Sequence, residues 1–227
     1  MAAMNRASVG SLERHALAAI DQAEGELRDA YRHVYSRVIG DFAPWSFETV
    51  RQLAGKSATK APEWVQRLVG IMQKIAGNRI SLVTGTLKER VKGILQGPIV
   101  EGALRDGFGI DKIVRLLREP MAEAYTADYL IERIARTEII GSSNFASQAG
   151  AERAAEEFGL DMEKVWLSTP DNRTRDTHRA IHEQRRELGK PFNLPSGVAL
   201  QFPGDPSVDA PGEIINCRCA VAHEPKD

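Results

Sequence analysis

Two pairs of residues in the C-terminal part of the sequence are of types that bind zinc, His178 with His182 and Cys217 with Cys219. The histidines are four residues apart, so on a helix both side chains project from the same face. The cysteines are two residues apart, so on a strand both thiols point to the same side. Two nitrogen and two sulfur ligands suit a tetrahedral zinc ion. The pattern therefore admits a structural zinc site.

The same four residues also fit an interpretation without metal. One residue between two cysteines is not the commoner spacing of zinc-binding turns, and more than thirty residues separate the two pairs. In that case the cysteines are small buried groups and the histidines lie on the surface. A disulfide is not expected, because a ring closed across so few residues is strained. We expect reduced thiols and no metal or other cofactor.

A dense run of charged residues follows the predicted strand that ends in Trp166 and Leu167. Its acids, arginines and histidine could supply a general acid, a general base and anion-stabilising groups for phosphodiester cleavage. They also suit a turn and a helix start, because Asp171 is good turn or cap material and Asp176 can pair with Arg173 or Arg179 at helical spacing. We favour the turn and helix start. The run comprises Asp171, Arg173, Arg175, Asp176 and His178.

A second charged group, Arg136-Thr137-Glu138, lies inside an otherwise apolar helical face. An arginine followed by a glutamate can serve nucleotide chemistry, but no glycine-rich phosphate loop accompanies it in the sequence. We therefore expect paired charges that anchor this helix to the C-terminal part of the chain. Such a pair specifies the register of packing more than it adds stability.

The first 160 residues, which must position Arg136 and Glu138, are predicted to be helical. Apolar residues recur at helical spacing from Leu12 to Val38 and predict one amphipathic helix that ends at Gly40. A turn over 41–46, a short helix to about Ala54 and a linker, KSATKAP, follow. Further helices are predicted from Pro62 to about Gly77, from a capping box at Thr86 to a break at Gly97-Pro98, from Asp111 to about Glu119, and from Thr126 to about Phe158.

The sequence changes in character after residue 160, and seven of the eleven prolines lie from Pro170 onward. The apolar runs shorten to strand length at 165–167, 198–202 and 219–222, and one helix is predicted from Arg173 to Arg185. The segment from Phe202 to Pro206 predicts a rigid surface turn. We therefore predict an α+β fold in which a mainly helical N-terminal two-thirds precedes a small C-terminal α+β unit with short antiparallel strands, divided into domains 1–125 and 126–227.

Composition places the chain among folded globular proteins, with 42% hydrophobic and 27% charged residues. With a net charge of −1, the chain does not have the excess of basic residues that is typical of autonomous DNA-binding proteins, so any DNA contact must be local. The apolar runs fall far short of the roughly 20 residues that span a bilayer. The first residues also lack the apolar core of a secretory signal. We expect neither membrane association nor secretion.

Several of these motifs lie in a fixed order between Ile131 and Val221. They are Arg136-Thr137-Glu138, Val165-Trp166, Asp171 with Arg173, Arg175 and His178, then Phe192, Pro203-Gly204-Asp205-Pro206 and Ile215-Asn216-Cys217-Arg218-Cys219. No single motif is specific, but the ordered set resembles the phage Mu F-like minor head protein family. The family's recurrent histidine and cysteines fall on His178, Cys217 and Cys219. His182 lies outside that pattern, so Asp171 is the other candidate for a fourth metal ligand.

This resemblance implies a structural role rather than an enzymatic one. A minor head protein is a component of the procapsid, incorporated in few copies near the portal vertex, and its expected partners are the portal protein and capsid components. The family is associated with procapsid assembly, DNA packaging or DNA delivery, with local DNA contact left open. The expected locations are the virion head and, during assembly, the host cytoplasm.

Two other functions remain open from the sequence. The first is a small nuclease or nucleotide-modifying effector domain that uses Arg136, Glu138, Asp171 and His178. A cleft that joins these residues would favour it. The second is a scaffold-like interaction module in which the helices make the contacts and the C-terminal unit is only a cap.

Overall fold

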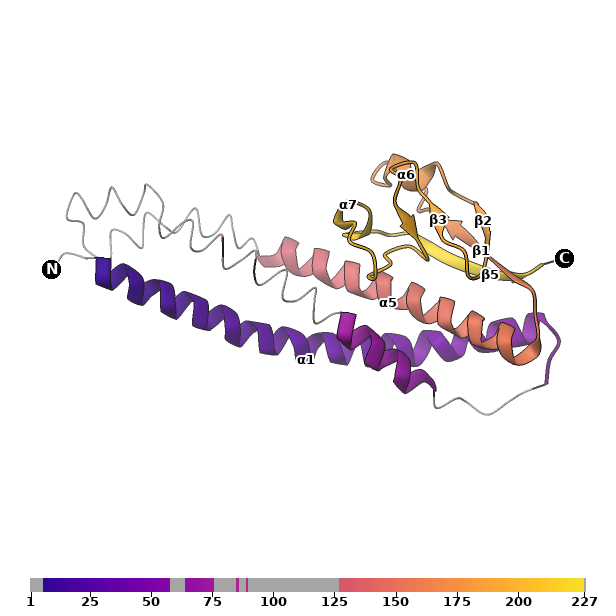
Figure 1. Cartoon of the computed structure of the whole chain (residues 1–227), viewed down its shortest axis with the longest axis horizontal. Coiled ribbons are helices and arrows are strands. Elements are labelled where there is room, and N and C mark those ends of the chain that lie inside the picture. The colour runs from indigo at the N-terminus through magenta and orange to yellow at the C-terminus, as the bar shows by residue number, and fades with distance from the viewer. Residues whose placement is uncertain (1–5, 58–63, 76–84, 86–88, 90–126, 227) are drawn as a thin grey trace. The chain divides into compact units, whose positions relative to one another are not determined.

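A computed structural model describes residues 6–57, 64–75, 85, 89 and 127–226. It confirms the predicted α+β class, with long helices followed by short antiparallel strands (Figure 1). No helix in the described ranges is long and apolar enough to cross a membrane. A helix also covers residues 64–75. The other elements are α1 (Arg6–Leu53), α5 (Ala127–Phe158), β1 (Met162–Leu167), α6 (Asp176–Arg179), β2 (Arg185–Glu187), β3 (Phe192–Asn193), β4 (Ala199–Leu200), α7 (Pro211–Ile214) and β5 (Ala220–Pro225).

The chain forms two compact units, and the division is not simply one point along the sequence. One unit takes residues 1–30 and 77–130, and the other takes residues 31–76 and 131–227. Residues 31–76 therefore group with the C-terminal part, whereas the predicted division at 125 and 126 places them in the N-terminal region. We call this second unit, residues 31–76 and 131–227, the C-terminal unit.

Helix α1 does not end at Gly40 as predicted, and this prediction is wrong. It continues through the predicted turn and through Pro44 to Leu53. A proline inside a helix lacks a backbone donor and costs about 3 kcal/mol or more. Burial of the surrounding apolar side chains offsets this cost, because each large one contributes about 1.5–3 kcal/mol. The buried residues are Ile39, Ala43, Phe47 and Val50.

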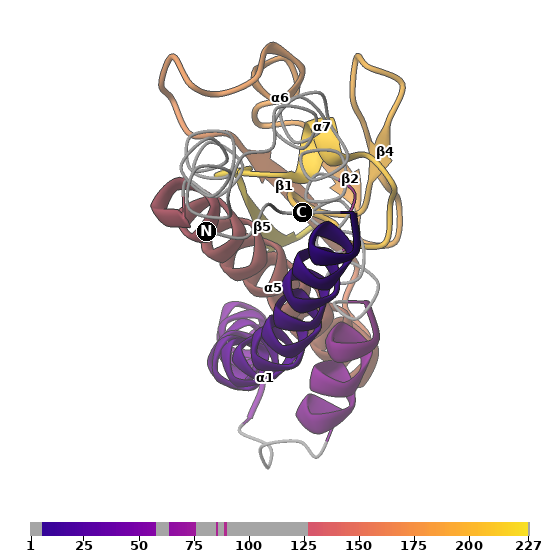
Figure 2. The same ribbon diagram turned by 90° about the vertical axis from the view of Figure 1, so that its left-hand side faces the viewer.

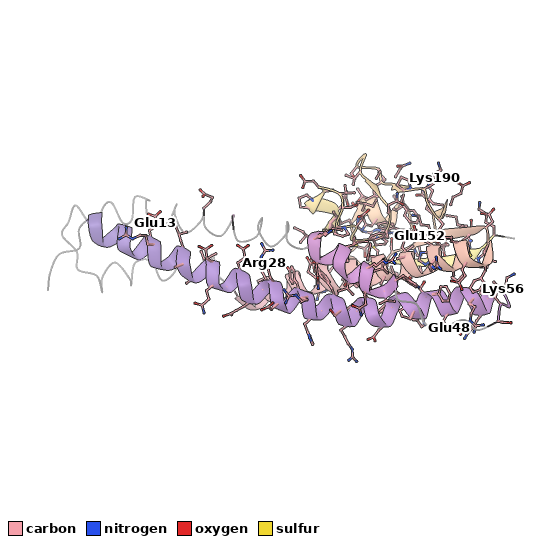
Figure 3. The ribbon with its side chains drawn as sticks, turned by 60° about the horizontal axis from the view of Figure 1, so that its bottom comes forward. Glu13, Arg28, Glu48, Lys56, Glu152 and Lys190 are labelled. Atoms are coloured by element: carbon pink, nitrogen blue, oxygen red, sulfur yellow. The ribbon has the colours of Figure 1, made fainter. Side chains whose placement is uncertain are left out.

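The end of α1 follows the ordinary chemistry of helix termini. Gly55 has a φ of 64°, and the Lys56 amide donates to the Arg51 carbonyl at 3.0 Å. The Arg51 guanidinium donates in turn to the Glu48 carboxylate and to the Lys56 carbonyl, which lies just beyond the helix (Figure 3). These bonds satisfy groups that have no partner inside the helix and fix the direction in which the chain leaves it.

The predicted helix that ends near Phe158 is confirmed as α5, and it lies between the C-terminal part of α1 and the strands (Figures 1 and 2). Its glycines allow close contacts. A methyl group on Gly150 would lie 2.4 Å from the Ala43 carbonyl oxygen, and one on Gly141 would lie 2.9 Å from the Gly204 carbonyl oxygen. Next to Gly150, Ser46 Oγ donates to the Ser147 carbonyl at 2.7 Å. Small residues therefore let α5 approach its neighbours on two sides.

The predicted helix from Pro62 is confirmed over residues 64–75. Trp64 packs against the apolar group around Phe47, with their ring centroids 6.3 Å apart. The capping box at Thr86, the break at Gly97-Pro98 and the helix from Asp111 to about Glu119 lie outside the described residues.

Two small antiparallel sheets follow α5. The first has the order β2-β1-β5, and its register pairs Lys164 with both Arg186 and His223. The second pairs β3 with β4. The predicted apolar runs at 165–167, 198–202 and 219–222 correspond to β1, β4 and β5, with shifted ends. The core beneath them gathers around Trp166, with the ring of Phe192 5.3 Å away.

The predicted helix from Arg173 to Arg185 is largely wrong, because only the turn α6 forms. After it the backbone bends at Glu183, which has a φ of 60°. The Glu183 amide then donates to the Trp166 carbonyl at 2.8 Å, and the Trp166 amide donates to the Gln184 carbonyl at 3.1 Å. Pairing with β1 replaces the helical hydrogen bonds here.

Candidate metal centre

Three of the predicted site residues meet in the core of the C-terminal unit. His178 Nδ1 lies 3.6 Å from Cys217 Sγ and 3.4 Å from Cys219 Sγ. The three ligand atoms all lie within 4.8 Å of one another, and each residue is at most 2% exposed. The prediction that His178 lies on the surface is therefore wrong, whereas burial of both cysteines is confirmed.

His178 is held in place by the end of β1. The Ser168 hydroxyl, just after that strand, donates to the His178 carbonyl at 2.6 Å. The imidazole packs edge-on against Trp166, with ring centroids 5.1 Å apart. The short helix α6 thus presents His178 inward from a fixed backbone position.

The loop that carries the two cysteines is held by the Arg-Thr motif of α5. Asn216 has a φ of 59°, and its amide donates to Thr137 Oγ1 at 2.8 Å. Its side-chain carbonyl accepts a hydrogen bond from Arg136 Nη1 at 2.8 Å. Arg136 therefore anchors α5 to the C-terminal strands as expected, but through Asn216. Glu138 instead accepts a hydrogen bond from Tyr35 on α1.

Asn144 lies further along α5 than Arg136 and Thr137, and the sequence analysis did not single it out. Its side-chain nitrogen donates to the carbonyls of Pro203 and Cys219 at 2.9 and 3.0 Å, and its oxygen accepts from the Val221 amide at 3.1 Å. Asn144 is 4% exposed. A single buried asparagine thus joins the helix, the loop after β4 and the start of β5, and no local pattern predicts such a role.

Neither candidate fourth ligand joins the cluster. His182 is exposed, and its Nδ1 accepts a hydrogen bond from the Ser168 amide at 3.1 Å. Asp171 forms a bidentate pair with Arg218, with both oxygen–nitrogen distances 2.5 Å. These hydrogen bonds hold the pKa of Asp171 well below its usual range. The predictions that either residue completes the site are wrong.

Glu213 is a site residue that the sequence analysis missed. Its Oε2 lies 3.1 Å from His178 Nε2, although the two atoms are not aligned for a hydrogen bond. The Thr177 hydroxyl donates to the same oxygen at 2.9 Å. Burial acts to raise the pKa of Glu213, but hydrogen bonds from Ser196 and Thr177 and the nearby His178 outweigh it, so that the pKa is lowered.

The two thiols are inequivalent. A hydrogen bond from Cys217 and the proximity of His178 lower the pKa of Cys219, against the effect of burial. The same thiol–thiol bond, together with burial, raises the pKa of Cys217. Cys219 is therefore the sulfur that loses its proton first. A neighbouring histidine and a thiolate form the beginning of a metal-binding or redox-active group.

The four residues of the alternative catalytic set each hold a different structural partner. Arg136 binds Asn216, Glu138 binds Tyr35 and Asp171 binds Arg218, while His178 faces the sulfurs. The charged run after β1 is a turn and a short helix, as favoured from the sequence.

The turn that contains Gly204 is not on the surface, and that prediction is wrong. Residues 202–205 are buried against α5. The Asp205 carboxylate, 1% exposed, accepts hydrogen bonds from the amides of Gln201 and Ser207, both at 2.9 Å. The turn therefore acts as an internal support for α5.

Comparison with known proteins adds two findings. A family model described as Phage Mu protein F like protein matches residues 98–222, more than half of the chain. The NAD(+)-arginine ADP-ribosyltransferase EFV of Enterococcus faecalis (strain ATCC 700802 / V583) is 28% identical over 147 residues. That alignment covers 65% of this chain but only 28% of the relative, so the chain spans less than a third of that protein. No solved structure matches.

Proposed function

Because the chain belongs to the family of Phage Mu protein F like proteins, which supports a role in phage head morphogenesis, we propose that it is a minor head protein. It is incorporated in few copies near the portal vertex, where its partners are the portal protein and capsid components. It acts there in procapsid assembly, DNA packaging or DNA delivery. The family match over residues 98–222 carries this proposal.

The geometry of the family motifs agrees with an architectural role. Arg136 and Thr137 of α5 bond to Asn216, and Asn144 bonds to the loop after β4 and to Cys219. Segments far apart in the sequence are thereby joined through buried and half-buried hydrogen bonds, which specify one packing arrangement. A component that must present fixed surfaces to several partners in a particle needs such a framework.

The proposal is tested by following a tagged full-length chain in cells that assemble phage particles from the genome that encodes it. We expect the chain to sediment with procapsids and virions, at far fewer copies than the major capsid protein. Particles assembled without the portal protein should lack it. Sedimentation only as a free species would contradict the whole proposal, and normal incorporation without portal protein would contradict the vertex location.

A matched pair of variants tests whether the buried framework matters for incorporation. Asn216→Ala removes the side-chain carbonyl that accepts the hydrogen bond from Arg136, and alanine tolerates the φ of 59° at this position less well than asparagine, so fewer copies should enter particles. Asn193→Ala is the control, because Asn193 is exposed on β3. Equal incorporation of both variants would show that the framework is not required.

The printed name of the Enterococcus faecalis relative raises ADP-ribosyl transfer as a second candidate. We propose no such activity for this chain, because it spans under a third of that protein and because its candidate residues are engaged in structural contacts. Incubation of the full chain with NAD(+) and an arginine-containing acceptor should release no nicotinamide. Release that disappears in Glu138→Gln would overturn this conclusion.

Cleavage of DNA or RNA that disappears in Asp171→Asn would favour the nuclease alternative.

A further inference from the structure

We propose that His178, Cys217 and Cys219 bind one zinc ion, through the imidazole Nδ1 and two thiolate sulfurs. The sequence alone favours the opposite, two thiols packed as small apolar groups. Three independent features of the structure point to the metal. They are the distances between the ligand atoms, the carboxylate on the far side of the imidazole, and the way in which both segments are fixed.

The first feature is the spacing of the ligand atoms. In a tetrahedral zinc site with Zn–S near 2.3 Å and Zn–N near 2.0–2.1 Å, a sulfur and a nitrogen ligand lie about 3.5 Å apart. His178 Nδ1 lies 3.6 Å from one sulfur and 3.4 Å from the other. Both nitrogen–sulfur separations therefore already match the edges of a zinc tetrahedron, and all three ligand atoms lie within 4.8 Å of one another.

The second feature is the carboxylate of Glu213. A histidine that binds metal through one ring nitrogen usually directs the other ring N–H to a carboxylate, which orients the ring and makes it a stronger ligand. Here Nδ1 faces the sulfurs and Nε2 lies 3.1 Å from Glu213 Oε2, at the distance of such a bond although the two atoms are not aligned for one. That oxygen is itself held by the Thr177 hydroxyl at 2.9 Å. Thiols that served only to fill space would not need an oriented carboxylate behind the histidine.

The third feature is the rigidity of both ligand segments. The Ser168 hydroxyl fixes the backbone at His178, and α5 fixes the loop at Asn216 and Cys219 through one buried and two half-buried hydrogen bonds. Arg218 lies between the two cysteines in sequence, but its side chain turns away to Asp171. The two thiols therefore point to the histidine as a preorganised pair.

Among the described residues three supply ligands, and we assign the fourth position of the tetrahedron to water. Zinc is the ion that best suits this set, because two thiolates and one imidazole are soft and borderline ligands and tetrahedral geometry is favoured. The ion's two positive charges also balance the two thiolates, which could not both be charged next to each other without it.

The test is to measure the metal content of the full chain purified without a metal-affinity tag or chelator. We expect about one zinc per chain. After removal of the zinc, Co²⁺ alone is added as a probe, and thiolate ligation should give charge-transfer absorption together with strong visible bands of a tetrahedral ion. Zinc below about a tenth of an equivalent, with no cobalt spectrum, would overturn the proposal.

Variants separate the ligands from their surroundings. His178→Ala, Cys217→Ser and Cys219→Ser should each lose the zinc, whereas His182→Ala, at the exposed histidine four residues from His178, should retain it. Glu213→Gln should keep the stoichiometry but weaken zinc affinity by about 10–100-fold. Equal zinc content in the wild type and all three ligand variants would show that the ion binds elsewhere. Circular dichroism of each variant confirms that it is folded before its zinc is counted.

Discussion

His178 and His223 are both buried in the C-terminal unit, but the nearest charged side chains are of opposite sign, a carboxylate at His178 and an ammonium near His223. His178 lies between two sulfurs and the carboxylate of Glu213. His223 has neutral partners, with Nε2 3.0 Å from Gln148 Oε1 and Nδ1 3.3 Å from Ser147 Oγ. Across the β1–β5 ladder it faces Lys164, whose side chain is fully buried.

The difference shows that burial alone does not decide what a histidine does. Burial lowers the pKa of His223 to about 3, with a further contribution from the nearby Lys164, so this imidazole is a neutral part of the core. Around His178 the anionic groups favour a bound cation instead. The same side chain is a packing element in one region and a candidate ligand in the other.

The largest expected effect is on the His178 region alone. If zinc is bound, a chelator should lower the melting temperature of the wild type by many degrees, because the unfolded chain has no preformed site and metal binding adds directly to stability. The Cys217→Ser variant should already have that lower melting temperature without chelator, and chelator should not lower it further. Without metal, the same substitution should cost only about 1–3 kcal/mol.

The control for this prediction is His223→Gln, which should respond to chelator as fully as the wild type. Thermal unfolding followed by circular dichroism measures all three proteins. If chelator leaves the melting temperature of the wild type unchanged, the proposed difference between the two histidines is contradicted.

The next effect concerns the helix that carries Ser147 and Gln148. Gly150→Ala places a methyl group 2.4 Å from the Ala43 carbonyl oxygen, so α1 and α5 must move apart. We expect a loss of stability near the upper end of about 1–3 kcal/mol in urea unfolding. Zinc content per folded chain should be unchanged, because the metal region contacts other parts of α5. The control is Gly189→Ala, because a methyl group there meets no atom within 4 Å. Gly159→Ala would not serve, because that glycine has a φ of 65°.

A third effect is a pH dependence that belongs to His223. Its pKa is about 3 in the folded chain against 6.5 as the ordinary value, so between these pH values the unfolded chain binds more protons. Stability from this group is therefore complete above pH 6.5 and is lost as the pH falls toward 3. Between pH 7 and pH 5 the loss should be about 2 kcal/mol.

Comparison with His223→Gln isolates this contribution, because loss of metal at low pH affects both proteins equally. Urea unfolding at several pH values gives the two curves. Their difference should shrink as the pH falls from 6.5, as the wild type loses the advantage of its neutral imidazole. Parallel curves from pH 7 to pH 4 would mean that His223 keeps an ordinary pKa.

The smallest effect is the influence of Lys164 on His223. Burial lowers the pKa of Lys164 to about 8, and its ammonium donates to the backbone and side-chain oxygens of Gln201 at 2.8 and 2.9 Å. Lys164→Met removes this positive charge, so the pKa of His223 should rise by less than about one unit and stay well below 6.5. Proton NMR of the imidazole as a function of pH measures it, and a fall in the pKa would contradict the electrostatic account.

The sequence predicts the parts of the fold that depend on local pattern. The stripe from Leu12 predicts α1, the run before Phe158 predicts α5, and the apolar segment at Val165 predicts β1, because each has its own periodicity. The breaks were less predictable. Pro44 stays helical since buried neighbours offset its missing donor, and the helix expected after Arg173 stops early since Glu183 and Gln184 bond to the distant Trp166.

The candidate site was predictable in its ligand types but not in its surroundings. His178, Cys217 and Cys219 are recognisable from chemistry and from the family resemblance. Glu213 could not be found, because a glutamate in a proline-rich segment has no distinguishing pattern and gains its role only when α7 packs beside α6. Asn144 and Asn216 are likewise ordinary polar residues in sequence. Their partners lie more than fifty residues away, and no local rule connects them.

The order of strands in the larger sheet has a consequence for how the molecule is made. Strand β1 pairs with β2 across a short loop, as between Val165 and Arg185, but it pairs with β5 only across more than fifty residues, as between Leu167 and Ala220. Closing the longer loop costs more chain entropy, so we expect β5 to dock after β2. Cys217 and Cys219 directly precede β5, and in this order they reach His178 only in that later step. We therefore expect both thiols to be open to oxidants and alkylating agents early in folding and to be protected once β5 has docked.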